Sequence, residues 1–139
     1  MGSELAVPFI DPRTIVFLSG IMGGLMAIVL AFLRRSYPPS VRGLEYWAGG
    51  TALLFLGGLA AASRGKSHEL VAITLANFLI FSGLYLQYVG SRRFFGQAPR
   101  VAPGMWMVVG ATLVSGWFAI VDPNYLPRLM IYVLVTTAV

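Results

Sequence analysis

The feature that most constrains this chain is its series of long apolar stretches without charge. A helix that crosses the hydrocarbon core of a bilayer needs about 20 mainly apolar residues. Four stretches meet this requirement, at residues 14–33, 44–63, 70–91 and 104–121, and Glu45 is the only charged residue within them. The connections between them are short, so neighbouring helices are expected to be antiparallel and packed together.

A fifth apolar run covers residues 129–139. At about 1.5 Å per residue it extends roughly 16 Å, half of a bilayer core. We therefore expect one all-α domain over residues 1–139, a polytopic transmembrane helix bundle with four full spans and the start of a fifth. We expect it to be the N-terminal part of a longer protein. The alternative is that residues 129–139 form an interfacial or half-inserted helix.

The composition agrees with a membrane environment. Hydrophobic residues make up 58% of the chain and charged residues 11%, whereas soluble domains carry about 25% charged residues. The net charge is +5, but the basic residues stand in short clusters between apolar runs, as topology determinants and lipid head-group contacts do. A nucleic-acid partner is not expected, because no basic groove with stacking aromatic residues is evident.

The distribution of basic residues predicts an orientation. The first and third connections hold six arginines, whereas the N-terminus and the other connections hold four basic residues: Arg34, Arg35, Arg42, Arg92, Arg93 and Arg100 against Arg13, Arg64, Lys66 and Arg128. Cytoplasmic loops are enriched in Lys and Arg. We expect a multi-pass protein of the bacterial inner membrane with its N-terminus outside and with Arg34, Arg35, Arg92 and Arg93 at the cytoplasmic border.

Polar groups inside a membrane are candidates for function, and the chain has few. Asn77 and Gln87 lie ten residues apart in the third stretch, so they project within roughly 80° of each other on a helix. The favoured interpretation is hydrogen bonding between helices; the alternative is a ligand cavity or an ion path. Trp117 is a candidate wall for a pocket that takes an unknown small apolar or aromatic ligand.

Small residues in the apolar stretches predict close helix packing. The candidate packing positions, of which Gly20 and Gly24 are spaced by four residues, are Gly20, Gly24, Gly57, Gly58, Gly110 and Gly116. Packing within one bundle is the favoured interpretation, and self-association or docking to other transmembrane subunits is the alternative.

Catalytic chemistry is not expected in this segment. The sequence has no cysteine and one histidine, His68, and a lone histidine beside Glu69 is a poor metal site. It also lacks paired carboxylates within the apolar stretches, a nucleophile with a base and a phosphate-binding loop. We expect no catalytic residue, metal or cofactor here.

Three segments carry a resemblance to a known family. They are Asp11-Pro12-Arg13-Thr14, the segment RRSYPPSVRGL at residues 34–44 with Trp47 beyond it, and GSRRFFG at residues 90–96. Together they resemble the N-terminal multi-helix membrane region of proteobacterial GGDEF-type diguanylate cyclases. The resemblance implies a module of about seven spans, followed by a cytoplasmic domain that makes cyclic di-GMP from two GTP. The chain itself contains no GG(D/E)EF sequence.

Two functions of different classes follow. The first is a membrane-embedded sensory or anchoring module that controls a C-terminal cytoplasmic diguanylate cyclase. The second is a non-catalytic structural subunit that packs in a larger membrane protein complex. Further spans and a GGDEF motif downstream would favour the first function, and a stop codon soon after Val139 the second.

Overall fold

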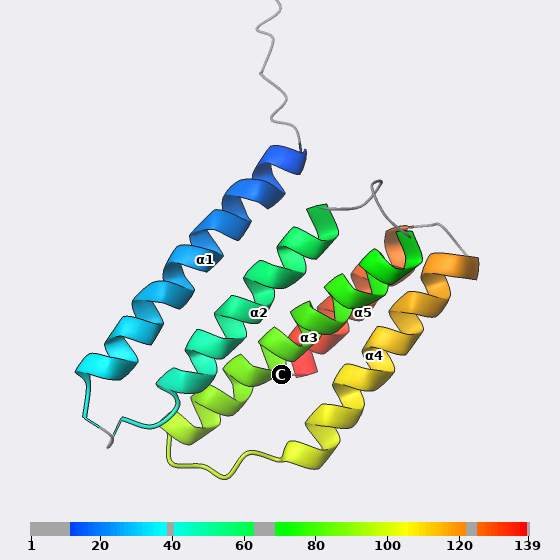
Figure 1. Ribbon diagram of the computed structural model, residues 1–139. Coiled ribbons are helices and arrows are strands. Elements are labelled where there is room, and N and C mark those ends of the chain that lie inside the picture. Colours follow the sequence, from blue (N-terminus) through cyan, green and yellow to red (C-terminus); the bar gives the residue numbers. More distant parts are fainter. Residues whose placement is uncertain (1–11, 39–40, 63–68, 122–124, 139) are drawn as a thin grey trace, which may run out of the picture.

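The computed structural model describes residues 12–38, 41–62, 69–121 and 125–138, and all the regular secondary structure in this part is α-helical. The five helices of this described part are α1 (Pro12–Ser36), α2 (Leu44–Ala62), α3 (Glu69–Phe94), α4 (Val101–Val121) and α5 (Tyr125–Ala138) (Figure 1). The expected all-α fold class is therefore confirmed.

Three helices in the described part are long and apolar enough to cross a membrane. They are Leu18–Ser36 of α1, Leu70–Phe94 of α3 and Val101–Val121 of α4. The helix α2 has 19 residues, but Glu45 and four glycines lower its hydropathy. The helix α5 has 14 residues, fewer than the roughly 17 that a transmembrane helix needs at the least.

Consecutive helices are neighbours in space. Helices α1 to α4 lie side by side in chain order with alternating direction, and α5 lies behind α3 and α4 (Figure 1). The apolar core is formed where α3, α4 and α5 meet, around Phe81, Tyr85, Val89, Val108 and Val135. The first and third connections of the chain lie at the same end of the bundle, as alternating direction requires.

The outward faces of the bundle are strongly apolar. In α1, Met22 and Phe32 expose 69% and 67% of their surface, and in α4 Leu113 exposes 66%. A soluble protein rarely exposes a contiguous apolar surface of this extent. Lipid chains would cover these faces in a bilayer.

The helices α2 and α3 approach each other along a ladder of small residues, which we call the glycine ladder. It pairs Gly43 with Gly90, Gly50 with Gly83, and Gly57 with Ala76. A Cβ atom added at Gly50 would lie 2.7 Å from the carbonyl oxygen of Gly83, and one at Gly57 would lie 3.2 Å from the carbonyl oxygen of Ala76. Because the rungs recur every seven residues in both helices, one face of each helix stays turned toward the other.

The ladder ends where α2 begins. Gly43 has φ of +106°, a conformation that glycine adopts at little cost, and a Cβ atom here would collide with the carbonyl oxygen of Gly90. The indole Nε1 of Trp47 donates to the carbonyl oxygen of Gln87 at 3.1 Å. The start of α2 is thereby bonded to the last turns of α3.

The outer helices use different contacts. Gly24 of α1 packs on the ring of Phe55 in α2, with atoms of that ring 3.3 Å from the position of a Cβ. Gly104 of α4 lies directly against the ring of Tyr85, whose hydroxyl donates to the carbonyl oxygen of Val101 at 3.1 Å. The first turn of α4 is therefore fixed to α3.

Of the six glycines expected to pack helices, four contact a neighbouring helix and two do not. Gly20, Gly24 and Gly57 face the side chains described above or their neighbours, and Gly116 lies near Thr74. A Cβ atom at Gly58 or Gly110 would meet nothing within 4 Å. The four-residue spacing therefore identifies the contact of α1 with Phe55 of α2, whereas the glycines of the ladder are spaced by seven residues.

Two helices begin three or four residues before the expected apolar stretches. The helix α4 begins at Val101 and α5 at Tyr125, so that Pro103 and Pro127 lie inside their first turns. Proline is tolerated there because the first N–H groups of a helix have no partner within the helix. The expected starts at residues 104 and 129 are too late for this reason.

We predict that Gly50→Ala destabilises the bundle whereas Gly58→Ala does not. A methyl group at Gly50 would meet the backbone of Gly83 at 2.7 Å, and overpacking of this kind costs about 1–3 kcal/mol. Unfolding in mixed micelles of non-ionic detergent and dodecyl sulfate, followed by circular dichroism, measures the difference. Equal stability of the two variants would contradict the ladder.

Candidate functional site

Asn77 of α3 is the most deeply buried of the three side chains expected to form a site within the membrane. It is 3% exposed, and its Oδ1 accepts a hydrogen bond from the hydroxyl of Tyr132 in α5. The ring of Tyr132 packs on Phe81 with centroids 5.0 Å apart. The amide oxygen of Asn77 therefore has a hydrogen-bond partner on a neighbouring helix.

Gln87 lies two to three turns further along α3 in a different environment. It is half-buried, and its Cγ packs on Gly50, 2.9 Å from the position that a Cβ would occupy there. Together with Leu84, Tyr88, Ser91 and Thr136 it lines a cleft of about 310 Å³ between α3 and α5. Asn77 does not line this cleft, so the structure does not bring the two amides into one cavity.

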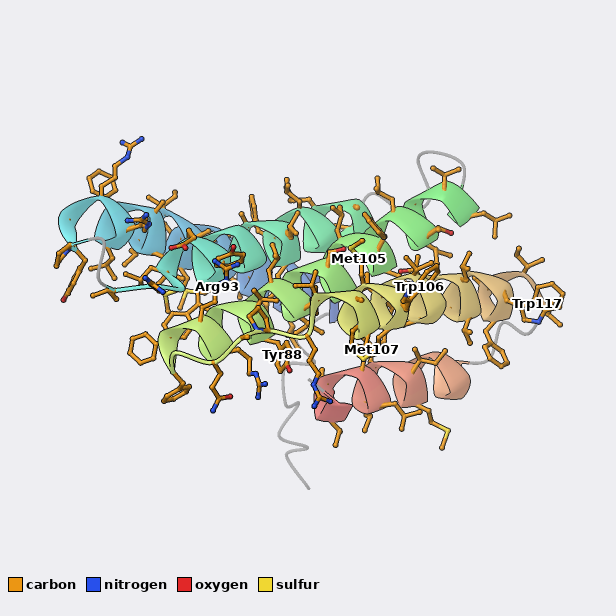
Figure 2. The ribbon with its side chains drawn as sticks, turned by 90° about the horizontal axis from the view of Figure 1, so that it is seen from below. Tyr88, Arg93, Met105, Trp106, Met107 and Trp117 are labelled. Atoms are coloured by element: carbon orange, nitrogen blue, oxygen red, sulfur yellow. The ribbon has the colours of Figure 1, made fainter. Side chains whose placement is uncertain are left out.

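Trp117 lies apart from both amides. It projects from α4 near the end opposite to the arginines of the connections, and its side chain is 65% exposed (Figure 2). Neither the cleft beside Gln87 nor the surroundings of Asn77 include Trp117. Such a position, an indole near the end of an apolar helix, is typical of side chains at a membrane interface.

One end of the bundle gathers arginines, and we call it the arginine end. It comprises the last turns of α1 and α3, the start of α2 and the connections that join these helices, with Arg34, Arg35, Arg42, Arg92, Arg93 and Arg100. The one ion pair among the described residues joins Arg34 and Glu45 at 3.2 Å. Both side chains are more than 40% exposed, so the pair adds little stability.

Aromatic rings surround these arginines. The guanidinium of Arg93 lies 4.6 Å from the ring centroid of Tyr46 in α2, and that of Arg92 lies 5.9 Å from the centroid of Tyr88. Figure 2 shows Arg93 between α2 and α3, whereas Tyr88 lies on the side of α3 that faces α5. The two neighbouring arginines therefore lie against aromatic rings on opposite sides of α3.

A cluster of rings completes the arginine end. Trp47 packs on Phe94 with centroids 5.5 Å apart, and Phe94 meets Phe95 edge to face at 5.6 Å. Aromatic and basic side chains mixed at one end of apolar helices are the composition of a membrane–water interface. The arrangement marks the level at which lipid head groups would lie.

Two further hollows are apolar. One of about 450 Å³ lies between α1 and α2 beside Gly24 and Phe55, and one of about 480 Å³ lies beside Leu75, Phe78 and Thr112. Both open onto the apolar outer surface of the bundle. Their apolar lining suits lipid chains rather than a polar substrate.

The described part of the chain shows no group of three or more His, Asp or Glu side chains that could hold a metal ion. His68 and the basic residues Arg64 and Lys66 lie outside the described residues.

The comparisons with known proteins find no match: no family model, no curated protein and no solved structure resembles this chain. The likeness to the membrane region of diguanylate cyclases therefore stays a prediction from loop and border residues.

Sequence reasoning did not identify Tyr132 as the partner of Asn77. Tyr132 lies in the fifth apolar run, which offered no charge or spacing that pointed to the third. The available signal was the hydroxyl of Tyr132 inside an apolar run, because a buried tyrosine hydroxyl usually has a hydrogen-bond acceptor. The position of Asn77 then predicts where on α3 that acceptor lies.

We predict that the hydrogen bond between Asn77 and Tyr132 couples α5 to α3. In a double-mutant cycle of Tyr132→Phe and Asn77→Leu, the coupling energy is expected to be about 0.6–1.7 kcal/mol, the range for such bonds in membrane proteins. Unfolding in mixed micelles supplies the four free energies. Purely additive effects would show that the bond contributes nothing to packing.

Proposed function

We propose that the chain crosses the bacterial inner membrane with its arginine end in the cytoplasm and its N-terminus outside. Six arginines and one carboxylate, Glu45, occupy this end in the described part, and Lys and Arg are retained on the cytoplasmic side. In this arrangement α1 to α4 are four full spans. The helix α5 is the start of a fifth that heads toward the cytoplasm.

The span assigned to α2 rests on its neighbours. It lies antiparallel between α1 and α3 (Figure 1), both of which are long and apolar enough to cross a membrane. Of the residues that lower its hydropathy, Glu45 lies at the arginine end and pairs with Arg34, and Gly50 and Gly57 are buried against α3. Lipid contacts the remaining faces.

The function proposed for this bundle is that of a sensory or anchoring module in a signalling protein. The observation that carries the proposal is the graded attachment of the helices. The helices α2 and α3 are held together by three close backbone contacts of the glycine ladder, whereas α5 is held by Tyr132 and the apolar side chains around it. A rigid pair beside a less firmly held helix is the kind of element that a ligand or membrane state can bias between two positions.

The effector proposed for the module is a diguanylate cyclase that follows in the cytoplasm. Two of the three segments that resemble such proteins, residues 34–44 and 90–96, belong to the arginine end. An odd number of spans brings the chain into the cytoplasm, where GTP is available.

A structural subunit of a larger membrane complex is the second candidate function. The observation that favours it is the exposed face of α1, where more than half of the surface of each of four apolar side chains is exposed: Met22, Met26, Val29 and Phe32. A partner helix would bury this face in place of lipid.

We predict that the arginine end is inaccessible from outside the cell. The chain has no cysteine, so Ser3→Cys and Gln97→Cys each introduce a single thiol. A membrane-impermeant maleimide added to intact cells is expected to label Ser3→Cys, and to label Gln97→Cys only after the cells are opened. The reverse pattern would overturn the orientation.

We predict that Tyr132→Phe in the whole gene changes cyclic di-GMP in cells by about three- to eighteen-fold, the factor that corresponds to the energy of one such hydrogen bond. The matched control is Thr137→Val, which removes only a bond to the Val133 carbonyl within α5. Cyclic di-GMP is measured by mass spectrometry of cell extracts. A reading frame that stops soon after Val139 would contradict the signalling function and favour the subunit.

A further inference from the structure

One face of α3 runs from the core to the arginine end, and its side chains change along it from apolar to basic. Its residues follow the spacing of three and four that places them on one side of a helix: Phe81, Leu84, Tyr88 and Arg92. Tyr132 of α5 covers Phe81, and Thr136 of α5 lies across the cleft from Leu84 and Tyr88. Arg92 stands at the end of this face, beyond the cleft.

Arg92 has fewer hydrogen-bond acceptors than its guanidinium requires. Its Nε is buried and has no hydrogen-bond partner, and one of its terminal nitrogens donates to the carbonyl oxygen of Ala98 at a long 3.4 Å. Among the described residues no carboxylate pairs with it, since the ion pair there is that of Arg34 and Glu45. A buried donor that lacks an acceptor costs free energy, and the cost is larger for a charged group.

A cleft lined by Tyr88, whose ring centroid lies 5.9 Å from the guanidinium carbon of Arg92, offers further polar groups. Gln87 and Ser91 line it from α3 and Thr136 from α5, and its volume is about 310 Å³. The hydroxyl of Ser91 donates to the carbonyl oxygen of Gln87 at 2.9 Å. The side-chain amide of Gln87 takes part in no described hydrogen bond, so it can donate to a ligand in the cleft. Leu84 forms the apolar wall that continues toward the membrane centre.

We propose that this cleft binds the head group of an anionic phospholipid. The guanidinium of Arg92 pairs with the phosphodiester, the amide of Gln87 donates to head-group oxygens, and the acyl chains follow the apolar wall at Leu84. Basic pockets between transmembrane helices on the cytoplasmic side suit this class of ligand, and arginine pairs with phosphate through two parallel hydrogen bonds. The level of the head group rests on the proposed orientation of the bundle.

The test compares lipids on the intact protein in non-ionic detergent. Phosphatidylglycerol, phosphatidylcholine and inorganic phosphate are titrated separately, and bound molecules are counted by native mass spectrometry. The wild type is expected to retain phosphatidylglycerol at concentrations about tenfold lower than phosphatidylcholine. Competition by inorganic phosphate at similar concentrations would overturn a lipid site in favour of a soluble anion.

Two substitutions separate the cleft from the general charge of the arginine end. Arg92→Gln is expected to weaken phosphatidylglycerol binding about tenfold, whereas Arg35→Gln, which removes the same charge from an exposed position at the same end, changes it less than about twofold. Arg92→Lys keeps the charge but loses the two parallel hydrogen bonds, so it is expected to weaken binding by about threefold, less than Arg92→Gln does. Equal losses for Arg92→Gln and Arg35→Gln would overturn the site.

The outcome separates the lipid site from the proposed function. If cysteine labelling places the arginine end in the cytoplasm but phosphatidylglycerol and phosphatidylcholine bind alike, the site is wrong and the orientation stands. If phosphatidylglycerol binds as expected but labelling shows the arginine end outside, the site stands and the orientation is wrong. Melting temperatures of the variants, followed by circular dichroism in the same detergent, show whether each retains the fold.

Discussion

The close approach of α2 and α3 is the constraint on which the remaining packing depends. Backbone atoms of the two helices lie so near at Gly50 and Gly83 that neither position has room for a methyl group. Within a bilayer the hydrophobic effect does not drive helices together, so dispersion contacts over such short distances supply much of the attraction. The seven-residue recurrence keeps the contact continuous from Gly43 to Gly57, and the other helices then attach to the outer surfaces of this pair.

The attachment of α4 and α5 adds polar contacts to the apolar ones. Tyr85 and Tyr132 each combine a packed aromatic ring with a hydroxyl that donates to another helix: Tyr85 to the start of α4, and Tyr132 to Asn77. Such residues fix the position of a helix along its neighbour, because a ring tolerates sliding whereas a hydrogen bond does not. The helix α1 lacks a comparable described bond along its apolar length and contacts α2 through Gly24 and Phe55.

Hydropathy alone was sufficient to predict an all-helical membrane-type bundle, because no other structure accommodates uncharged stretches of this length. The glycine ladder was equally present in the sequence, at Gly43, Gly50 and Gly57 and at Ala76, Gly83 and Gly90, but a search for four-residue spacing does not detect it. The partner of Asn77 and the surroundings of Arg92 could not be predicted. The first depends on where α5 lies against α3, and the second on the path of the connection that brings Ala98 to Arg92. Neither leaves a periodic trace in the chain.

The neighbour order of the helices also bears on how the protein assembles. Each helix packs on the one synthesised just before it, and the ladder joins two segments that leave the ribosome in succession. The pair α2 and α3 can therefore close as a hairpin once residue 94 has entered the bilayer, without waiting for later helices. The remaining helices then dock on a surface that already exists. Asn77 therefore faces lipid without a partner only while α4 and α5 are being synthesised.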